Sequence, residues 1–143
     1  MTVGDLMKPE PRVVTATEPI ARAAGIMRDH GVGFVPVVDD VTRMIVRGVI
    51  TDRDIAVRCV AAGHRGGCTV HHHMSGGPVV SVAPSAEADE VLQVMREERV
   101  RRVLVTEDGR LVGIISRADL FRRDGTGAEA GTSGGASPRD REV

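Results

Sequence analysis

Apolar positions along the chain follow two periods, one typical of helices and one typical of strands. Apolar residues recur at helical spacing between Ile20 and Met27 and again between Ala88 and Met95, which predicts two amphipathic helices. Apolar runs bounded by turn residues predict buried strands. These strands are expected at 34–38, 45–50, 103–105 and 111–115, with shorter extended segments at 13–15 and 79–82. The pattern therefore predicts a mixed α/β fold.

Residues that cap helices predict where the helices begin. Thr17 and Ser85 are expected to cap the two amphipathic helices. A third helix is expected to start at Asp52 and to turn one apolar side inward, formed by Ile55, Ala56, Cys59 and Val60. A polar segment with Gly and His follows, and then the signals start again. Each half of the chain is thus predicted to run strand, helix, strand, strand, helix.

One pattern of seven residues occurs twice, as Gly48–Asp54 and as Gly113–Asp119. Each copy places a hydroxyl residue three positions before an aspartate, directly after an apolar run. This spacing is typical of a capping box in which Asp replaces the usual Glu or Gln. The hydroxyl and the free N–H groups of a helix start also suit a phosphate, and the carboxylate can accept hydrogen bonds from a ribose diol. The residues concerned are Thr51 and Asp54 in the first copy and Ser116 and Asp119 in the second.

A constant separation links the two halves. Gly48 and Gly113 are 65 positions apart, as are the paired hydroxyl residues and the paired aspartates, whereas Met27 and Met95 are 68 apart. A three-residue difference in the turn between two strands reconciles these separations and predicts an internal repeat. We expect repeats at 1–66 and 67–123 and a disordered, Gly/Ser-rich tail at 124–143.

Composition narrows the function classes. The 143 residues carry 19 Lys and Arg against 20 Asp and Glu, a formal net charge of -1, which does not favour broad electrostatic binding of nucleic acid. Aromatic residues make up 1% of the chain, so the stacking platform typical of single-strand binding is missing. No run is apolar enough for a membrane span, and the first residues lack a secretory signal. We expect a cytoplasmic protein without membrane contact, in which Cys59 and Cys68 stay reduced.

The duplicated segments resemble a known family. They comprise Asp5–Met7, 32–40, Gly48–Asp54, 100–108 and Gly113–Asp119. In this order, over roughly residues 1–123, the chain resembles a tandem pair of cystathionine β-synthase (CBS) domains, a Bateman module, and is similar to small stand-alone bacterial CBS-pair proteins. The resemblance implies an α/β (α+β) fold of two pseudo-symmetric β-α-β-β-α CBS repeats packed through their sheets. It also implies clefts that take adenine nucleotides and assembly into a homodimer.

The resemblance also implies a set of ligand-binding residues. The hydroxyls and carboxylates of the duplicated pattern contact phosphate and ribose in this family, which maps onto Thr51, Asp54, Ser116 and Asp119. Backbone near Val14, Val37, Val82 and Val105 would hold the base. Four arginines near the same places, Arg53, Arg101, Arg102 and Arg117, are candidates to reach phosphates. The alternative for these arginines is a solvated basic edge.

Cysteine and histidine gather in one short span. Cys59, His64, Cys68 and the run at 71–73 lie close together in the sequence, and Cys68-x-x-His71 has a usable spacing for metal ligands. The signal is weak, because no second pair of ligands completes a site and adjacent histidines on a turn point in different directions. Exposed linker histidines are the alternative. The sequence therefore assigns no metal, with Cys68 and His71 as the weak candidates.

The leading hypothesis from the sequence is a non-enzymatic sensor of AMP, ADP or ATP that signals to a protein target and requires no cofactor. The sequence shows no nucleophile–base pair, no phosphate-binding P-loop and no metal triad, so an enzyme is not favoured. Two alternatives remain open. One is a ligand-free structural or protein-interaction module, and the other is a sensor of S-adenosylmethionine, NAD or a metal.

Overall fold

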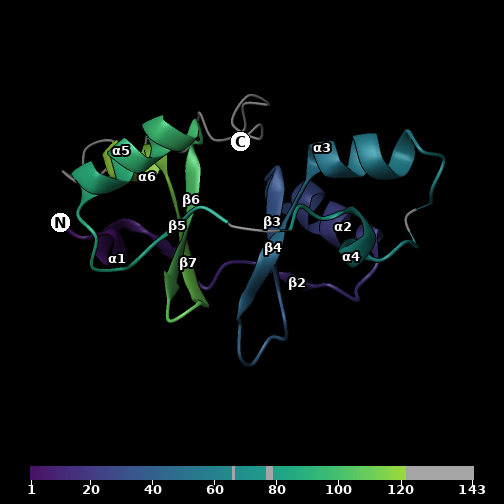
Figure 1. The fold of residues 1–143 in the computed structure, drawn as a ribbon, viewed down its shortest axis with the longest axis horizontal. Helices are drawn as coiled ribbons and strands as arrows, with labels where there is room; N and C mark the ends of the chain where they lie inside the picture. Colours follow the sequence, from purple (N-terminus) through teal and green to yellow (C-terminus); the bar gives the residue numbers. More distant parts are fainter. Residues whose placement is uncertain (66, 77–78, 122–143) are drawn as a thin grey trace. The chain divides into compact units, whose positions relative to one another are not determined.

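The computed structural model describes residues 1–65, 67–76 and 79–121, and the tail predicted at 124–143 lies outside them. The chain forms two compact units (Figure 1). One unit is Arg12–Val79, and the other combines Met1–Pro11 with the described residues from Val80 onward. The first residues of the chain therefore fold with its second half. The repeats expected from the sequence at 1–66 and 67–123 divide the chain in sequence order, and these boundaries stay a prediction.

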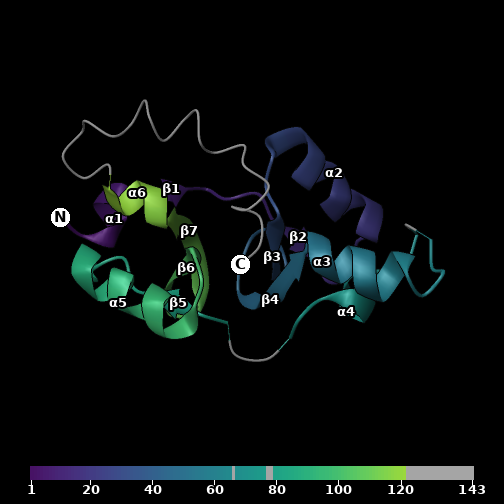
Figure 2. The ribbon, with the colours of Figure 1, turned by 90° about the horizontal axis from the view of Figure 1, so that it is seen from above.

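The unit Arg12–Val79 is built on a three-stranded sheet in the order β2-β3-β4. Strand β2 runs parallel to β3, and β3 runs antiparallel to β4. The strands are β2 (Val14–Thr15), β3 (Phe34–Val38) and β4 (Val46–Thr51), and the helices are α2 (Ile20–His30), α3 (Asp52–Asp54), the π-helix η1 (Ile55–Val60) and α4 (Val70–His73). These helices lie on one side of the sheet in both ribbon views (Figures 1 and 2).

The other unit has a four-stranded sheet in the order β1-β7-β6-β5. Strand β5 is parallel to β6, whereas β7 pairs antiparallel with both β6 and β1. The strands are β1 (Lys8–Pro9), β5 (Ser81–Val82), β6 (Arg102–Glu107) and β7 (Arg110–Ser116), and the helices are α1 (Val3–Leu6), α5 (Ala88–Glu98) and α6 (Arg117–Phe121). Within the described ranges, no helix has the length and apolar character needed to cross a bilayer.

Strand pairing repeats from one unit to the other. Val14 lies opposite Val37 in the parallel pair of the first unit, and Val82 lies opposite Val105 in the second. The antiparallel pairing shifts register directly after Val37 in one unit and directly after Val105 in the other. The predicted mixed α/β fold with an internal repeat is therefore confirmed, and the structure adds a bulge that recurs at the same position in both units.

Each unit encloses its own core of aliphatic side chains and methionine, as expected for a chain with so few aromatic residues. The core of Arg12–Val79 is formed by Val14, Ile20, Ala23, Met27, Val35, Val37, Ile50, Cys59 and Val70. The other core is formed by Val3, Ala88, Val91, Met95, Val103, Val105, Ile115 and Leu120. In both units the inward stripe of the long helix packs on the sheet, which is why each helix follows the predicted spacing.

The predicted helix caps at Thr17 and Ser85 are wrong. Helix α2 follows Pro19, which supplies no side-chain cap, and the Ile20 N–H donates to the Cys68 carbonyl at 2.7 Å. Helix α5 follows Glu87, which forms a capping box with Glu90. A distant backbone carbonyl satisfies the start of α2, and this partner cannot be seen in the local sequence.

The helix predicted from Asp52 begins at that residue, but its geometry and the residues that it buries differ from the prediction. After three α-helical residues it becomes the π-helix η1. Cys59 is 1% exposed, whereas Val60 is 65% exposed and Ala56 is also exposed. Only Cys59 and the partly buried Ile55 from this helix pack on the core, so the inward placement predicted for Val60 and Ala56 is wrong.

Candidate functional site

The first copy of the duplicated pattern forms a corner where β4 ends and α3 begins. The Thr51 N–H donates to Asp54 Oδ2 and the Asp54 N–H donates to Thr51 Oγ1, each at 3.0 Å. This is the capping box expected from the spacing. Asp54 is only 7% exposed although it is an aspartate, and a buried carboxylate needs hydrogen-bonding partners.

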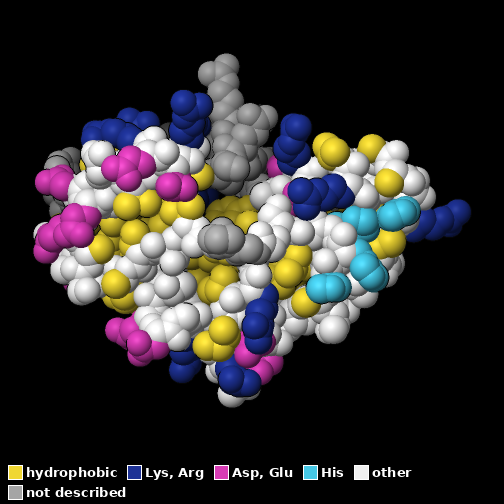
Figure 3. All heavy atoms as spheres, viewed as in Figure 1, with side chains coloured by type: hydrophobic (Ala, Val, Ile, Leu, Met, Phe, Trp, Pro, Cys, Tyr) yellow, Lys and Arg dark blue, Asp and Glu magenta, His cyan; other side chains and the backbone are white. Residues whose placement is uncertain are grey.

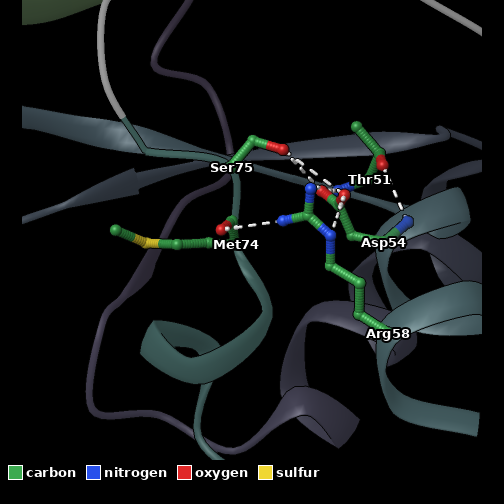
Figure 4. Close-up of polar contacts among 5 residues, drawn as sticks. All are labelled: Thr51, Asp54, Arg58, Met74 and Ser75. Atoms are coloured by element: carbon green, nitrogen blue, oxygen red, sulfur yellow. Dashed lines mark hydrogen bonds and ion pairs between the residues drawn. The ribbon is translucent and has the colours of Figure 1, made fainter. Parts of the chain in front are cut away.

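Two further side chains contact the Asp54 carboxylate (Figure 4). The Ser75 hydroxyl lies 3.3 Å from both carboxylate oxygens. Arg58, one helical turn beyond Asp54, places its Nε 3.8 Å from Oδ1 and donates through Nη1 to the Met74 carbonyl at 3.3 Å. Sequence reasoning missed both Ser75 and Arg58. The corner is therefore a polar cluster in which a hydroxyl and a guanidinium face one buried carboxylate.

Ser75 reaches this corner because its backbone crosses β4 at a glycine. The Ser75 N–H donates to the Val49 carbonyl at 2.9 Å, and the Val49 N–H donates to the Ser75 carbonyl at 3.2 Å. A Cβ placed on the neighbouring Gly48 would lie 2.5 Å from the Ser75 carbonyl oxygen. Only glycine allows two backbones to approach this closely. The glycine of the duplicated pattern thus has a role that the capping box alone does not explain.

The second copy forms the same corner between β7 and α6. The Ser116 N–H donates to Asp119 Oδ2 at 2.9 Å, and the Asp119 N–H donates to Ser116 Oγ at 3.1 Å. Asp119 is 1% exposed. A Cβ on Gly113 would meet the Met7 Sδ and would lie 3.0 Å from the Lys8 carbonyl oxygen. Both corners therefore combine a buried capping carboxylate with a segment crossing at a glycine.

The remaining predicted ligand-binding residues fall into two groups. Three of the four predicted valines are fully buried and one is half-buried, so any contact with a base would come from their backbone; they are Val14, Val37 and Val105, with Val82 half-buried. The arginines lie at or beside the corners and are exposed except for the half-buried Arg102; the exposed ones are Arg53, Arg101 and Arg117. The Arg117 N–H donates to the Arg101 carbonyl at 2.8 Å, and its guanidinium lies 5.7 Å from the Phe121 ring centroid.

A second cluster lies beside the first corner, where η1 meets the segment around α4. The ligand atoms of Cys59, Cys68 and His73 all lie within 4.8 Å of one another. His64 joins them through its Nδ1, which is 3.4 Å from His73 Nε2. Figure 3 shows histidine side chains grouped on this unit's surface. The structure thus brings the predicted Cys68 together with Cys59 and His73, whereas the predicted His71 lies outside the group and is exposed.

Burial sets the protonation chemistry of this cluster. It lowers the pKa of the His73 imidazole, and the neighbouring His64 and His72 lower that pKa further. It also raises the pKa of the Cys59 thiol, with a smaller contribution from Cys68. Both shifts favour the neutral form of a group removed from water. A neutral imidazole is the form that can bind a metal.

The CBS domain family model matches residues 3–60 and 70–125. The chain belongs to this family, and the two matched segments make it a CBS-pair regulatory module. Among its relatives, CBS domain-containing protein YhcV of Bacillus subtilis (strain 168) is 33% identical over 132 residues, which is 92% of this chain and 91% of the relative.

Two solved structures share this fold. A crystal structure of Hypoxic Response Protein I with two coordinated zinc ions is 35% identical, with a TM-score of 0.74, and covers 86% of this chain and 98% of that chain. A crystal structure of CBSX2 in complex with AMP is 27% identical, with a TM-score of 0.72, and covers 86% of this chain and 95% of that chain. The expected CBS-pair fold is therefore confirmed.

Proposed function

We propose that this protein is a non-enzymatic regulatory module that binds an adenine nucleotide, with AMP, ADP and ATP as the candidates, and passes its binding state to a protein partner. The observation that carries this proposal is the duplicated corner, which presents a hydroxyl beside a buried carboxylate in each unit. A related CBS pair of the same fold forms a complex with AMP, which supports the choice of ligand.

Each corner offers groups that suit one part of a nucleotide. The Thr51 and Ser116 hydroxyls can donate to a phosphate, and the Asp54 and Asp119 carboxylates can accept from a ribose diol. Exposed arginines at the corners add charge for phosphate recognition, namely Arg53, Arg101 and Arg117, with the half-buried Arg102 beside them. The backbone of the paired strands would read the base, at Val14 and Val37 in one unit and at Val82 and Val105 in the other.

The position of the Ser75 hydroxyl leads to a specific prediction for nucleotide binding at the first corner. It now donates toward the Asp54 carboxylate, where a ribose hydroxyl would also donate. A ribose bound at Asp54 must therefore replace Ser75 or share the carboxylate with it. If the ribose replaces Ser75, the Asp54 carboxylate exchanges one hydroxyl donor for another and does not lose a hydrogen bond, so this step costs little free energy.

Assembly into a homodimer is part of the proposal. Three large apolar side chains remain exposed on the helices that follow the two corners: Val57 at 53%, Val60 at 65% and Phe121 at 56%. Exposed apolar side chains that cluster on one helix are typical of contact surfaces, and Val57 and Val60 lie on η1. Native mass spectrometry of the purified protein reports the oligomer and any carried-over nucleotide in one measurement.

Calorimetric titration with AMP, ADP and ATP tests the proposal. We expect at least one of these nucleotides to bind the wild-type protein. Asp54→Asn or Asp119→Asn should weaken that binding by about tenfold or more, because the amide carries no charge and replaces one of the two carboxylate oxygens that can accept from a ribose diol with an NH2 group that donates. Asp29→Asn on α2, where the side chain is exposed and away from both corners, is the control. Binding of no adenine nucleotide would favour the ligand-free module, and a response only to S-adenosylmethionine or NAD would favour those ligands.

A further inference from the structure

Three Cys and His side chains beside the first corner, Cys59, Cys68 and His73, have ligand atoms close enough for a metal site, and His64 lies against one of them. A tetrahedral zinc site with bonds of about 2.3 Å to sulfur and about 2.0–2.1 Å to nitrogen holds its ligand atoms about 3.3–3.8 Å apart. The ligand atoms of Cys59, Cys68 and His73 all lie within 4.8 Å of one another. The 3.4 Å between His64 Nδ1 and His73 Nε2 is long for a hydrogen bond but matches the nitrogen–nitrogen edge of such a tetrahedron.

Two of these side chains, Cys59 and His73, are buried, whereas Cys68 is half-buried and His64 is exposed. Cys59 is 1% exposed and His73 is 5% exposed, and Cys59 belongs to the same core cluster as Val70. A buried imidazole that meets thiols and a second imidazole gains little from ordinary hydrogen bonding, because sulfur is a weak donor and acceptor.

The backbone holds the ligands in place through several hydrogen bonds. The Cys68 carbonyl accepts from the Ile20 N–H at 2.7 Å, which ties it to the start of α2. The Arg65 carbonyl accepts from the Cys68 N–H at 3.1 Å and lies 3.6 Å from Cys59 Sγ. His64 is tied to Cys59 by its N–H, which donates to the Cys59 carbonyl at 2.9 Å. These hydrogen bonds fix the backbone positions from which the ligand side chains extend.

We propose that Cys59, Cys68 and His73 bind one zinc ion and that His64 supplies the fourth ligand. Two thiolates and two imidazoles form a donor set that suits Zn²⁺ and disfavours Mg²⁺ and Ca²⁺, which prefer oxygen. The site goes beyond the proposed nucleotide-binding function and uses none of the residues assigned to the nucleotide.

A bound ion would also act on the neighbouring corner. Cys59 lies on η1, which continues from α3 and Asp54, whereas His73 ends α4 and lies two residues before Ser75. The ion would therefore fasten together the two segments that meet at the Asp54 carboxylate. We expect zinc to stabilise the unit Arg12–Val79, because the ion binds the preformed site of the folded state more tightly than the unfolded chain.

Cobalt and zinc titrations of the full chain test the site. The protein is stripped of metal with a chelator under reducing conditions and titrated with Co²⁺, whose absorption reports tetrahedral thiolate ligation, and Zn²⁺ then displaces the Co²⁺. We expect one ion per chain and a thermal unfolding midpoint that rises with Zn²⁺. Cys68→Ser and His73→Asn should each weaken zinc binding by about 100-fold or more, and His64→Asn by about tenfold or more.

His71→Asn is the matched control, because His71 belongs to the same helix α4 but is exposed and outside the cluster. It should bind zinc as the wild type does. Cys68 is only half-buried, so Cys68→Ser tests ligation with little change to the core even if Cys59→Ser fails to fold. Absence of a tetrahedral Co²⁺ spectrum in the folded, reduced wild-type protein would overturn the site. A His64→Asn protein that binds zinc as tightly as the wild type would overturn the fourth ligand.

Discussion

The two units carry the same backbone corner but surround it with different chemistry. The segment Thr69–Ser75, which crosses β4, corresponds 67 positions earlier to Thr2–Lys8, which crosses β7. Ser75 lies opposite Val49 in one unit, and Lys8 lies opposite Ile114 in the other. Each follows a four-residue helix and a methionine. The Ser75 hydroxyl in one unit thus occupies the position that corresponds to the Lys8 ammonium in the other unit.

The same comparison separates structural from chemical requirements. The Thr2 N–H and the Thr2 hydroxyl both donate to Asp5 Oδ2 at the start of α1, whereas the Thr69 hydroxyl makes one hydrogen bond with His72 Nδ1 at the start of α4. The metal-ligand position His73 corresponds to Leu6, a half-buried apolar residue. The turn geometry is common to both units, and the Cys and His cluster belongs to Arg12–Val79 among the residues that the structure describes.

Alanine at the two crossing glycines should produce the largest difference between the units. Gly48→Ala places a Cβ 2.5 Å from a backbone oxygen of Ser75, which cannot move without breaking the pairing with Val49. We expect a loss of about 1–3 kcal/mol in the free energy of unfolding. Gly113→Ala should cost less, because the flexible Met7 side chain can move away and the Lys8 oxygen is 3.0 Å distant. Urea denaturation of both variants measures the difference.

Gly25→Ala is the control for a substitution at a glycine with open space, since its Cβ would meet only the end of the Arg28 side chain at 3.9 Å. This change lies within α2 and should be neutral or stabilising. If Gly48→Ala and Gly113→Ala lose equal stability, the backbone crossing is no tighter in one unit than in the other.

Short-range features of the corner could be predicted from the sequence. The capping box joins residues three positions apart, so spacing alone identified Thr51 with Asp54 and Ser116 with Asp119. The strands could be predicted from their apolar runs, because a strand that is buried in a sheet consists mostly of apolar residues. The role of Ser75 could not be predicted in the same way, since its partner Asp54 lies 21 positions away.

The sequence nevertheless held signals for the missed residues. A glycine inside a strand marks close backbone approach, and Gly48 and Gly113 each meet a crossing segment. In α4, Val70 and His73 are both buried and lie three positions apart, so the apolar Val70 fixes the inward phase of the helix. The same phase turns His71 outward. The spacing Cys68-x-x-His71 therefore pointed to the right segment and to a histidine on its exposed side.

Removal of the capping hydroxyls should have a smaller effect that is equal in the two units. Thr51→Ala and Ser116→Ala each remove the acceptor of one N–H at a helix start, at 3.0 Å and 3.1 Å. We expect about 1 kcal/mol of destabilisation for each, the usual cost of losing such a cap. Thr17→Ala is the control, because Thr17 was expected to cap α2 and does not. A difference above about 1 kcal/mol between the two corners, measured by chemical denaturation, would show that one hydroxyl does more than cap.

The smallest expected effect comes from the hydroxyl that distinguishes the first corner. Ser75→Ala removes two 3.3 Å contacts to the Asp54 carboxylate, while the Thr51 N–H and Arg58 still face that carboxylate. Because long hydrogen bonds are weak and the carboxylate keeps other partners, we expect a loss of about 0.5–1 kcal/mol. Ser81→Ala, at an exposed strand position, is the matched control.

Nucleotide affinity of Ser75→Ala gives a sharper readout than its stability. If a ribose hydroxyl replaces Ser75 at Asp54, this variant should bind the nucleotide at least as tightly as the wild type, because the ligand no longer competes with a hydroxyl of the chain. Weaker binding would instead mean that Ser75 contacts the ligand directly.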